Sequence, residues 1–160
     1  MMRPDMCIPC GEGFVNIRVG AIIQKDGKLL MVGNEDVDYL YSVGGRIQFG
    51  ETAEDAVVRE VLEETGTAME VDRLGFVEEN YFYADTPSKM GKLIYEIGYY
   101  FYMKVPEDFD PVCRSFTADD QKEYLTWVTP DEGRQMFPAF FATDPLIPGE
   151  GVKFLTTDMR

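Results

Sequence analysis

An alternating segment that runs into a two-residue turn limits the fold of this chain more than any other feature. In residues 14–23, apolar residues from Val15 to Ile23 occupy every second position, which predicts a strand with one buried face. Asp26-Gly27 supplies the positive φ angles of a tight hairpin turn, and residues 29–32 return as a second strand. Residues 39–43 predict a short third strand that ends at Gly44-Gly45. The chain therefore opens with an antiparallel β-structure.

One helix is predicted directly after this β-structure. Thr52 can cap its first turn, with Asp55 three residues on, and Gly66 is a suitable stop, so the helix has about four turns. Residues 69–82 and 93–105 are rich in aromatic and branched side chains, which predicts a second antiparallel pair of strands.

The C-terminal part predicts one more strand and one more helix. Residues 123–128 predict the last strand, and Pro130, followed by two acids, predicts a helix that residues 136–141 continue. We expect residues 1–12 and 143–160 to be irregular termini. The order of elements predicts an α+β fold with a mixed central sheet and helices on both sides, but not the strand order.

Length and charge narrow the classes of function. A chain of 160 residues, 45% of them hydrophobic, suits a single domain of residues 1–160 with a real core. The net charge of -14 disfavours a polynucleotide or an anionic membrane as a partner. No apolar run approaches the roughly 18 residues of a membrane span, and the first ten residues lack the apolar stretch of a secretory signal. We therefore expect a cytoplasmic protein.

The three cysteines do not indicate a metal site or a disulfide framework. Cys7 and Cys10 form a C-x-x-C pair, but a structural zinc ion normally has four ligands and the chain contains no histidine. An odd number of cysteines also fits a disulfide framework poorly. We expect no zinc site at the N-terminus.

Three acids gather on one face of the predicted helix. At about 100° per residue, Glu60, Glu63 and Glu64 share that face, and Val57 and Val61 lie broadly opposite. Like charges at these spacings repel by a few tenths of a kcal/mol per pair. The face is either a solvated acidic surface or a seat for a divalent cation, since Mg²⁺ prefers carboxylate oxygens plus water.

The residues around this face resemble a known motif. The preceding segment, GGRIQFGE, contains glycines that allow the backbone to approach a ligand closely. From its second glycine onward, the chain resembles the Nudix box, G-x5-E-x7-R-E-U-x-E-E-x-G-U, where U is a bulky aliphatic residue. The positions that match in register are Gly45, Glu51, Arg59, Glu60, Val61, Glu63, Glu64 and Gly66, and only the last position departs, as Thr67. This fixed spacing makes the chain similar to the Nudix hydrolase family.

The resemblance implies a Nudix-like α/β/α sandwich with a divalent-metal site. Members of the family use Mg²⁺, or Mn²⁺ in its place, to direct water onto a phosphorus atom of a pyrophosphate. By position, Glu60 and Glu64 would be the principal metal ligands and Glu63 a further one. The backbone carbonyl of Gly45 would complete the set.

The resemblance also implies roles for the neighbouring charged residues. Arg59 would hold the carboxylates by charge-assisted hydrogen bonds, and Glu51 would help from the helix entrance. Because the chain has no histidine, a glutamate must accept the proton, and Glu60 is the first choice. Glu96 lies among apolar and aromatic residues, so it is either a second base or metal ligand outside the motif, or an edge-strand residue that faces solvent.

Candidate substrate contacts are less specific. Arg46 could meet phosphate, and Tyr41 and Phe82 could stack a nucleobase. Further candidates of the same two kinds are Tyr39, Tyr99, Tyr100, Lys89 and Lys92, although most aromatic residues serve a core and most lysines are solvated. We expect a small-molecule nucleotide as the substrate, and both ADP-ribose and a nucleoside triphosphate stay open.

Two other classes of function stay open on the sequence. An isopentenyl-diphosphate-isomerase-like enzyme shares the fold and needs a catalytic cysteine, for which Cys113 is the candidate. A non-catalytic nucleotide-sensing module is the other, although such modules often lose acids of the motif. The sequence also does not distinguish a monomer from a homodimer, a state common in the family.

Overall fold

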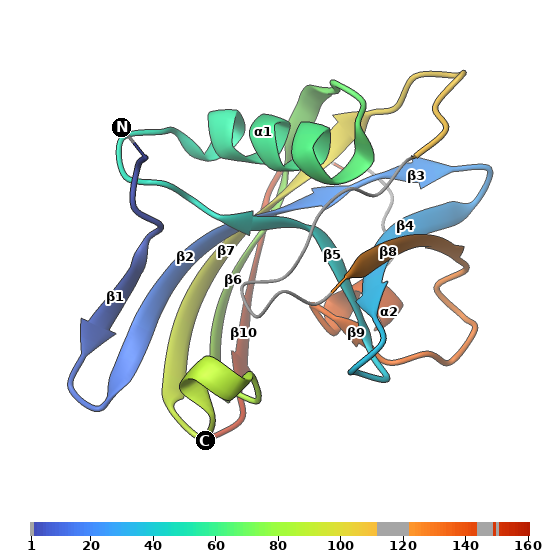
Figure 1. Cartoon of the computed structure of the whole chain (residues 1–160). Helices are drawn as coiled ribbons and strands as arrows, with labels where there is room; N and C mark the ends of the chain where they lie inside the picture. Colours follow the sequence, from blue (N-terminus) through green and yellow to red (C-terminus); the bar gives the residue numbers. More distant parts are fainter. Residues whose placement is uncertain (1, 112–121, 144–148, 150) are drawn as a thin grey trace.

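The computed structural model describes residues 2–111, 122–143, 149 and 151–160 (Figure 1). The strands are β1 (Cys7–Cys10), β2 (Gly13–Ile22), β3 (Gln24–Lys25), β4 (Lys28–Asn34), β5 (Leu40–Arg46), β6 (Glu70–Tyr83), β7 (Leu93–Lys104), β8 (Glu123–Val128), β9 (Met136–Phe137) and β10 (Lys153–Asp158). The helices are α1 (Ala53–Thr65), the short 3₁₀ helix η1 (Pro87–Lys89) and α2 (Phe140–Thr143). Within these described residues, no helix is long and apolar enough to cross a bilayer.

The sheet is mixed, as predicted. Its strands follow the order β10-β6-β7-β2-β5-β4-β3, and β1, β8 and β9 pair with β2, β4 and β5 outside this path. Three pairs are parallel, namely β2 with β7, β6 with β10, and β5 with β9. The remaining pairs are antiparallel.

Alternation along the strands divides the core between the two sides of the sheet. On one side, Val19 and Ala21 of β2 pack in a fully buried cluster with Val57 and Val61 of α1. On the other side, Ile22 belongs to a second cluster that includes the phenylalanines of α2. The predicted arrangement of helices on both sides of the sheet is therefore confirmed (Figure 1).

Local sequence signals position the hairpin and α1 as expected. Asp26 and Gly27 have φ angles of 52° and 74°, and they join β3 to β4 in a tight turn. The Thr52 side chain accepts a hydrogen bond from the backbone N–H of Asp55 at 3.1 Å, which caps the start of α1. Gly66, at a φ of 75°, ends the helix in the left-handed conformation.

Two predictions about the middle and the end of the chain are wrong. The third strand does not end at Gly44-Gly45 but continues to Arg46, because both glycines pair with Gly20 and Val19 of β2. No helix begins at Pro130, since Gly133, at a φ of 80°, turns the chain instead, and the second helix starts only at Phe140.

The prediction that residues 1–12 and 143–160 are irregular is also wrong. β1 pairs antiparallel with the start of β2, and β10 pairs in parallel with β6. Residues 123–128 are therefore a strand, as predicted, but not the last one. β1 forms a local hairpin with β2, whereas β10 pairs with a strand that is distant in sequence, which local composition does not reveal.

Candidate active site

The acidic edge of α1 lies directly against the two glycines of β5. A Cβ atom on Gly45 would lie 2.5 Å from Oε1 of Glu60, so only a glycine leaves room for this carboxylate. The backbone N–H of Gly44 donates to Oε1 of Glu64 at 3.2 Å. Only 6% of Glu64 is exposed, and its Oε2 is buried without a hydrogen-bond partner. The site therefore contains a carboxylate oxygen that the described protein atoms leave unsatisfied, which is costly unless a ligand binds it.

Arg59 connects two further carboxylates of α1 with a third that precedes the helix. Its guanidinium donates to Glu51 at 2.9 Å, to Glu60 at 2.7 Å and to Glu63 at 3.3 Å. It also donates to the backbone carbonyl of Arg46 at 3.2 Å, which links the helix to the end of β5. The predicted positioning role of Arg59 stays a prediction, but these contacts are the ones it requires.

Burial shifts the pKa of both Glu60 and Glu64. Burial raises the pKa of Glu64 well above its ordinary value, and the negative charges of Glu123 and Glu60 raise it further. Burial also raises the pKa of Glu60, although Arg59 opposes this shift. A cation would reverse the cost of ionising both groups.

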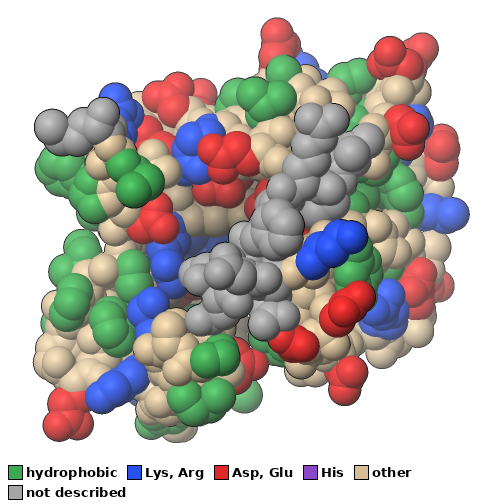
Figure 2. Space-filling view, viewed as in Figure 1, with side chains coloured by type: hydrophobic (Ala, Val, Ile, Leu, Met, Phe, Trp, Pro, Cys, Tyr) green, Lys and Arg blue, Asp and Glu red, His purple; other side chains and the backbone are tan. Residues whose placement is uncertain are grey.

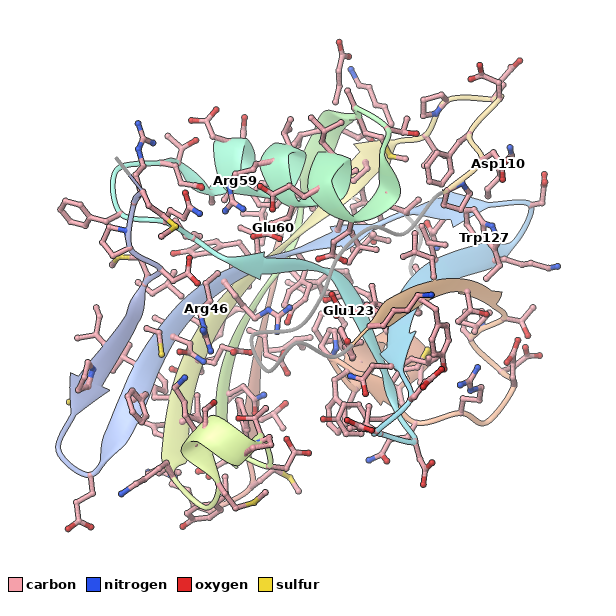
Figure 3. The ribbon with its side chains drawn as sticks, in the orientation of Figure 1. Arg46, Arg59, Glu60, Asp110, Glu123 and Trp127 are labelled. Carbon is pink, nitrogen blue, oxygen red and sulfur yellow. The ribbon has the colours of Figure 1, made fainter. Side chains whose placement is uncertain are left out.

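Glu123 also belongs to this site, although no local pattern in the sequence predicts it. It begins β8, and the Tyr41 hydroxyl donates a hydrogen bond to its carboxylate and accepts one from Asn34 at 3.2 Å. Its charge acts on Glu64. In Figure 3, Arg46, Glu60 and Glu123 surround the region below α1, whereas Trp127 lies away from it. Only the pairing of β8 with β4 brings Glu123 here.

Arg18 is the second residue that sequence reasoning missed. It occupies a polar position of β2, and its Nε is buried without a hydrogen-bond partner. Burial lowers the pKa of Arg18, but the charges of Glu96, Tyr100, Glu64 and Glu60 together raise it above its ordinary value. Arg18 therefore lies within electrostatic reach both of the α1 carboxylates and of Glu96.

The other candidate residues have varied positions. Arg46 pairs with Arg18 across β5 and β2, so both extend from the same side of the sheet. Glu96 pairs with Asn16, whose side-chain amide donates to it at 3.4 Å. Phe82 lies on the same side of the sheet as Arg18 and Arg46. In the register of the strands it is level with Phe14 of β2, whereas Gly44 is level with Gly20, which is about 20 Å further along. The structure does not bring Phe82 to α1.

The remaining candidates lie elsewhere. Tyr99 packs against the cluster beneath α1, on the opposite side of the sheet from Arg18. Tyr100 is 3% exposed and packs against the phenylalanines of α2. Tyr39 donates to Asp85 at 3.1 Å, and Nζ of Lys89 lies 5.2 Å from the centre of the Phe14 ring. Lys92 lines a pocket of about 480 Å³ at the far ends of β6 and β7.

The cysteines add nothing to this site. Cys7 and Cys10 are free thiols on β1. Cys113, the candidate of the isomerase alternative, lies outside the described residues.

The α1 carboxylates are the type of ligand that a divalent cation prefers, but their side chains are not arranged around a common centre. Among the described residues, no group of three or more His, Cys, Asp or Glu side chains has the arrangement of a metal site. Arg59 occupies oxygens of Glu60 and Glu63, while Glu64 keeps its free Oε2 next to Glu60. In Figure 2 the surface is hollowed below α1, with acidic side chains at the α1 rim and basic side chains inside the hollow.

Comparison with known proteins agrees with this arrangement. The family model of the NUDIX domain matches residues 15–148, and the chain therefore belongs to the Nudix hydrolase family. The match includes all the motif positions of α1 and β5, as well as Glu123.

Curated relatives match over shorter segments. A MutT-like protein of Streptomyces ambofaciens is 41% identical over 61 residues, which cover 38% of this chain and 40% of the relative. An ADP-ribose pyrophosphatase of Methanocaldococcus jannaschii is 39% identical over 61 residues, or 36% of each chain. A putative 8-oxo-dGTP diphosphatase of Bacillus subtilis is 44% identical over 45 residues, or 28% of this chain and 30% of the relative. The matched segments thus span 40% or less of each relative.

Solved structures are similar over most of the chain. A MutT NUDIX hydrolase from Burkholderia pseudomallei has a TM-score of 0.59 at 22% identity, covering 83% of this chain and 98% of that one. An ADP-ribose pyrophosphatase from Streptococcus suis has a TM-score of 0.56 at 18% identity, covering 87% and 98%. At these identities the likeness shows the fold, and the predicted α+β Nudix-like fold is confirmed.

Proposed function

We propose that this protein hydrolyses the pyrophosphate bond of a nucleoside diphosphate derivative and depends on Mg²⁺ or Mn²⁺. ADP-ribose and a nucleoside triphosphate are both substrates of the proposed class. The names of the relatives from M. jannaschii and B. subtilis support a nucleotide of this kind. The net charge of -14 supports a small molecule rather than a polynucleotide.

The observation that carries this proposal is the unsatisfied Oε2 of Glu64. A buried carboxylate with a free oxygen, beside the carboxylate of Glu60 and with the charge of Glu123 nearby, is unfavourable in the protein alone. A hard divalent cation would relieve this repulsion, because it binds carboxylate oxygens and retains positions for phosphate oxygens. The motif spacing and the buried geometry thus support the same ligand.

We assign the roles as follows. Glu60 and Glu64 would hold the cation, with Glu63 as a further ligand and the Gly45 carbonyl as an additional oxygen. When bound, such a cation neutralises charge on phosphoryl oxygens and lowers the pKa of a bound water. Arg59, which already contacts Glu60 and Glu63, would position these carboxylates.

The remaining roles concern the proton and the substrate. Glu51 keeps Arg59 in place through its hydrogen bonds, and its own side chain is only 6% exposed. Glu60 is the proposed proton acceptor, since the chain contains no histidine and the Glu60 carboxylate lies against Gly45 at the edge of α1. Arg46 would meet a phosphate, and Arg18 lies beside it in the sheet. Glu96 stays a second candidate for the base.

The proposal is tested by activity with a matched control. Purified protein is incubated with ADP-ribose, ATP and dGTP, with and without Mg²⁺, and released phosphate compounds are separated by chromatography. We expect turnover only with Mg²⁺, and Glu64→Gln should reduce kcat by more than about 100-fold because it removes a ligand oxygen. Glu54→Gln, on the exposed side of the same helix, should behave like the wild type. Turnover without any divalent cation, or full activity of Glu64→Gln, would contradict the proposal.

Two further properties belong to this proposal. We propose a cytoplasmic location, which fits a nucleotide substrate and free cysteines on β1. The choice between a monomer and a homodimer is testable by the mass of the protein in solution.

A further inference from the structure

One end of the central sheet carries apolar side chains that lie outside both core clusters. Val15 and Tyr95 point to the same side of the sheet as Val19 and Tyr99, because side chains alternate along a strand. Val19 and Tyr99 pack in the cluster beneath α1, but that helix lies at the opposite end of these strands from η1 (Figure 1). We use the name outer face for six residues that are neighbours across β1, β2, β7 and β6 and belong to neither cluster, namely Ile8, Val15, Tyr81, Tyr83, Leu93 and Tyr95.

The polar and apolar sides of these strands are the reverse of those of a sheet that faces water. Asn16, Asn80 and Glu96 alternate with the outer face and point to the opposite side, where Asn16 is only 5% exposed. Tyr83 and Ile8 of the outer face are 55% and 46% exposed. A sheet with one solvated side normally presents its polar residues there. The outer face therefore has the composition of a surface that is covered by a partner.

The tyrosines of the outer face are held in fixed positions. The rings of Tyr81 and Tyr95 stack at 4.6 Å and 28°, and the guanidinium of Arg160 lies 3.8 Å from the centre of the Tyr81 ring. The Tyr95 hydroxyl donates to Glu79 at 2.9 Å. A pocket of about 480 Å³ opens between these rings, and five of the six outer-face residues line it. Fixed tyrosine rings lose little conformational freedom on binding, which suits them to a protein interface.

The charges near the outer face suit a second copy of this chain. With a net charge of -14, two copies repel each other over most of their surfaces. Here, however, Glu79 accepts hydrogen bonds from two hydroxyl groups, and Asp158 pairs with Arg160 at 2.6 Å. Glu12, in the turn between β1 and β2, and Arg160, which follows β10, lie at opposite borders of the face. The face thus carries charges of both signs, one at each border.

A two-fold axis parallel to β7 would bring these borders together. Sheets that pack face to face keep their strands nearly aligned. Rotation about this axis places β1 of one copy opposite β10 of the other, since the two strands lie on opposite sides of β7. Glu12 then faces Arg160 of the partner subunit, and the symmetry forms this pair twice.

The same rotation matches the shape of the outer face. Tyr83 and Gly13 are both level with Leu93 of β7, on its two sides. Tyr83 therefore lies opposite Gly13 of the partner subunit. Gly13 has no side chain and lines the pocket, so the pocket provides room for the most exposed ring of the face.

We propose that the outer face binds a second copy of the chain, so that the protein forms a two-fold dimer with its sheets packed face to face. Tyr83 and Ile8 become buried, and Glu12 forms an ion pair with Arg160 of the partner subunit. This inference does not depend on the proposed reaction, because the outer face lies on the other side of the strands from Arg18.

The mass of the protein in solution tests the proposal. Light scattering between about 1 and 200 μM should show twice the chain mass of 18.2 kDa at the higher concentrations. Tyr83→Glu should raise the Kd of the dimer at least about 100-fold, because it places an unpaired carboxylate in the interface. The control is Leu62→Glu, a similar change at a residue of α1 that is 48% exposed, and it should dimerise like the wild type. A wild type that stays monomeric throughout, or an equal loss of dimer in both variants, would overturn the proposal.

Two further variants test the surface and its orientation. Ile8→Glu, on β1, should also give a monomer, and circular dichroism confirms that each variant is folded. Glu12→Arg should raise Kd about tenfold, since it places two positive charges together. Glu35→Arg makes the same charge change at an exposed position outside the face and should not weaken the dimer. A folded dimer in both Tyr83→Glu and Ile8→Glu would rule out the outer face, and an unchanged or lower Kd for Glu12→Arg would contradict the two-fold arrangement.

Discussion

Two regions of the protein pair their buried polar groups differently. One is the edge of α1, and the other is the polar floor, which consists of Asn16, Arg18, Glu78, Asn80 and Glu96 on β2, β6 and β7. At the edge, Arg59 connects Glu51, Glu60 and Glu63 in one network, and among the described carboxylates of this edge only Glu64 has a buried oxygen without a hydrogen-bond partner. On the floor, polar atoms on two different strands lack partners. A network that is nearly complete without a ligand holds its groups in place, whereas an incomplete one is satisfied only by what binds. We therefore expect substitutions at the edge and on the floor to have different effects on kcat and KM.

The largest effect that would separate the two regions is expected from Arg59→Lys. A lysine cannot reproduce the forked hydrogen bonds to Glu51, Glu60 and Glu63, so we expect kcat to fall by about 10- to 100-fold. KM for ADP-ribose should change little, because the floor is untouched. Steady-state kinetics at saturating Mg²⁺ measure both parameters. A rise in KM with an unchanged kcat would contradict the reaction role of the edge.

Gly45→Ala should perturb the edge with a smaller effect. The added methyl group would lie 2.5 Å from the carboxylate of Glu60 and would displace it. We expect about a tenfold loss of kcat. The unfolding free energy should stay within about 1 kcal/mol, since the clash involves the flexible end of a side chain. Urea denaturation is the control, and a large loss of stability would show that the glycine serves the fold instead.

Glu96→Gln decides to which region Glu96 belongs. If Glu96 acts only within the floor, KM for ADP-ribose rises several-fold and kcat stays near that of the wild type. If it is the base, kcat collapses and the pH dependence of kcat changes. Its register beside Asn16 and Asn80 makes the first result the expected one. The rate measured between pH 5 and pH 9 distinguishes the two.

The smallest effect concerns stability without metal. Burial raises the pKa of Glu64 above its ordinary value of 4.5, so the folded protein binds this proton more tightly than the unfolded chain does. The unfolding free energy should therefore fall as the pH rises above about 4.5, and Glu64→Gln should weaken this dependence. Added Mg²⁺ should restore stability at the higher pH values. Urea denaturation at pH 5 and pH 8 checks this, and stability that rises with pH through Glu64 would contradict it.

Local patterns in the sequence predicted those features of the α1 edge whose residues are close together in sequence. The cap at Thr52, the stop at Gly66 and the spacing of the α1 glutamates all depend on residues within a few turns of one another. The hairpin at Asp26-Gly27 was predictable for the same reason. These features follow from backbone conformation and helical period, which need no knowledge of the rest of the fold.

The floor could not be predicted, because it exists only after the strand order is known. Arg18 and Glu78 are 60 positions apart, and they become neighbours because β7 lies between β2 and β6. In the sequence, Arg18 is one of the residues that alternate with the apolar positions of residues 14–23. The position of Glu123 likewise depends on the pairing of β8 with β4, and the strand β10 depends on its pairing with β6. Such pairings depend on contacts distant in sequence, which local patterns do not encode.

The most direct test of the account is a calorimetric titration of the intact protein with Mg²⁺ and with Mn²⁺, each with and without ADP-ribose. We predict saturable binding to the wild type and to Glu54→Gln, and at least tenfold weaker binding to a folded Glu64→Gln. Absence of binding to the wild type with nucleotide present, or equal binding to all three proteins, would contradict the claim that the buried Glu64 carboxylate is part of a cation site.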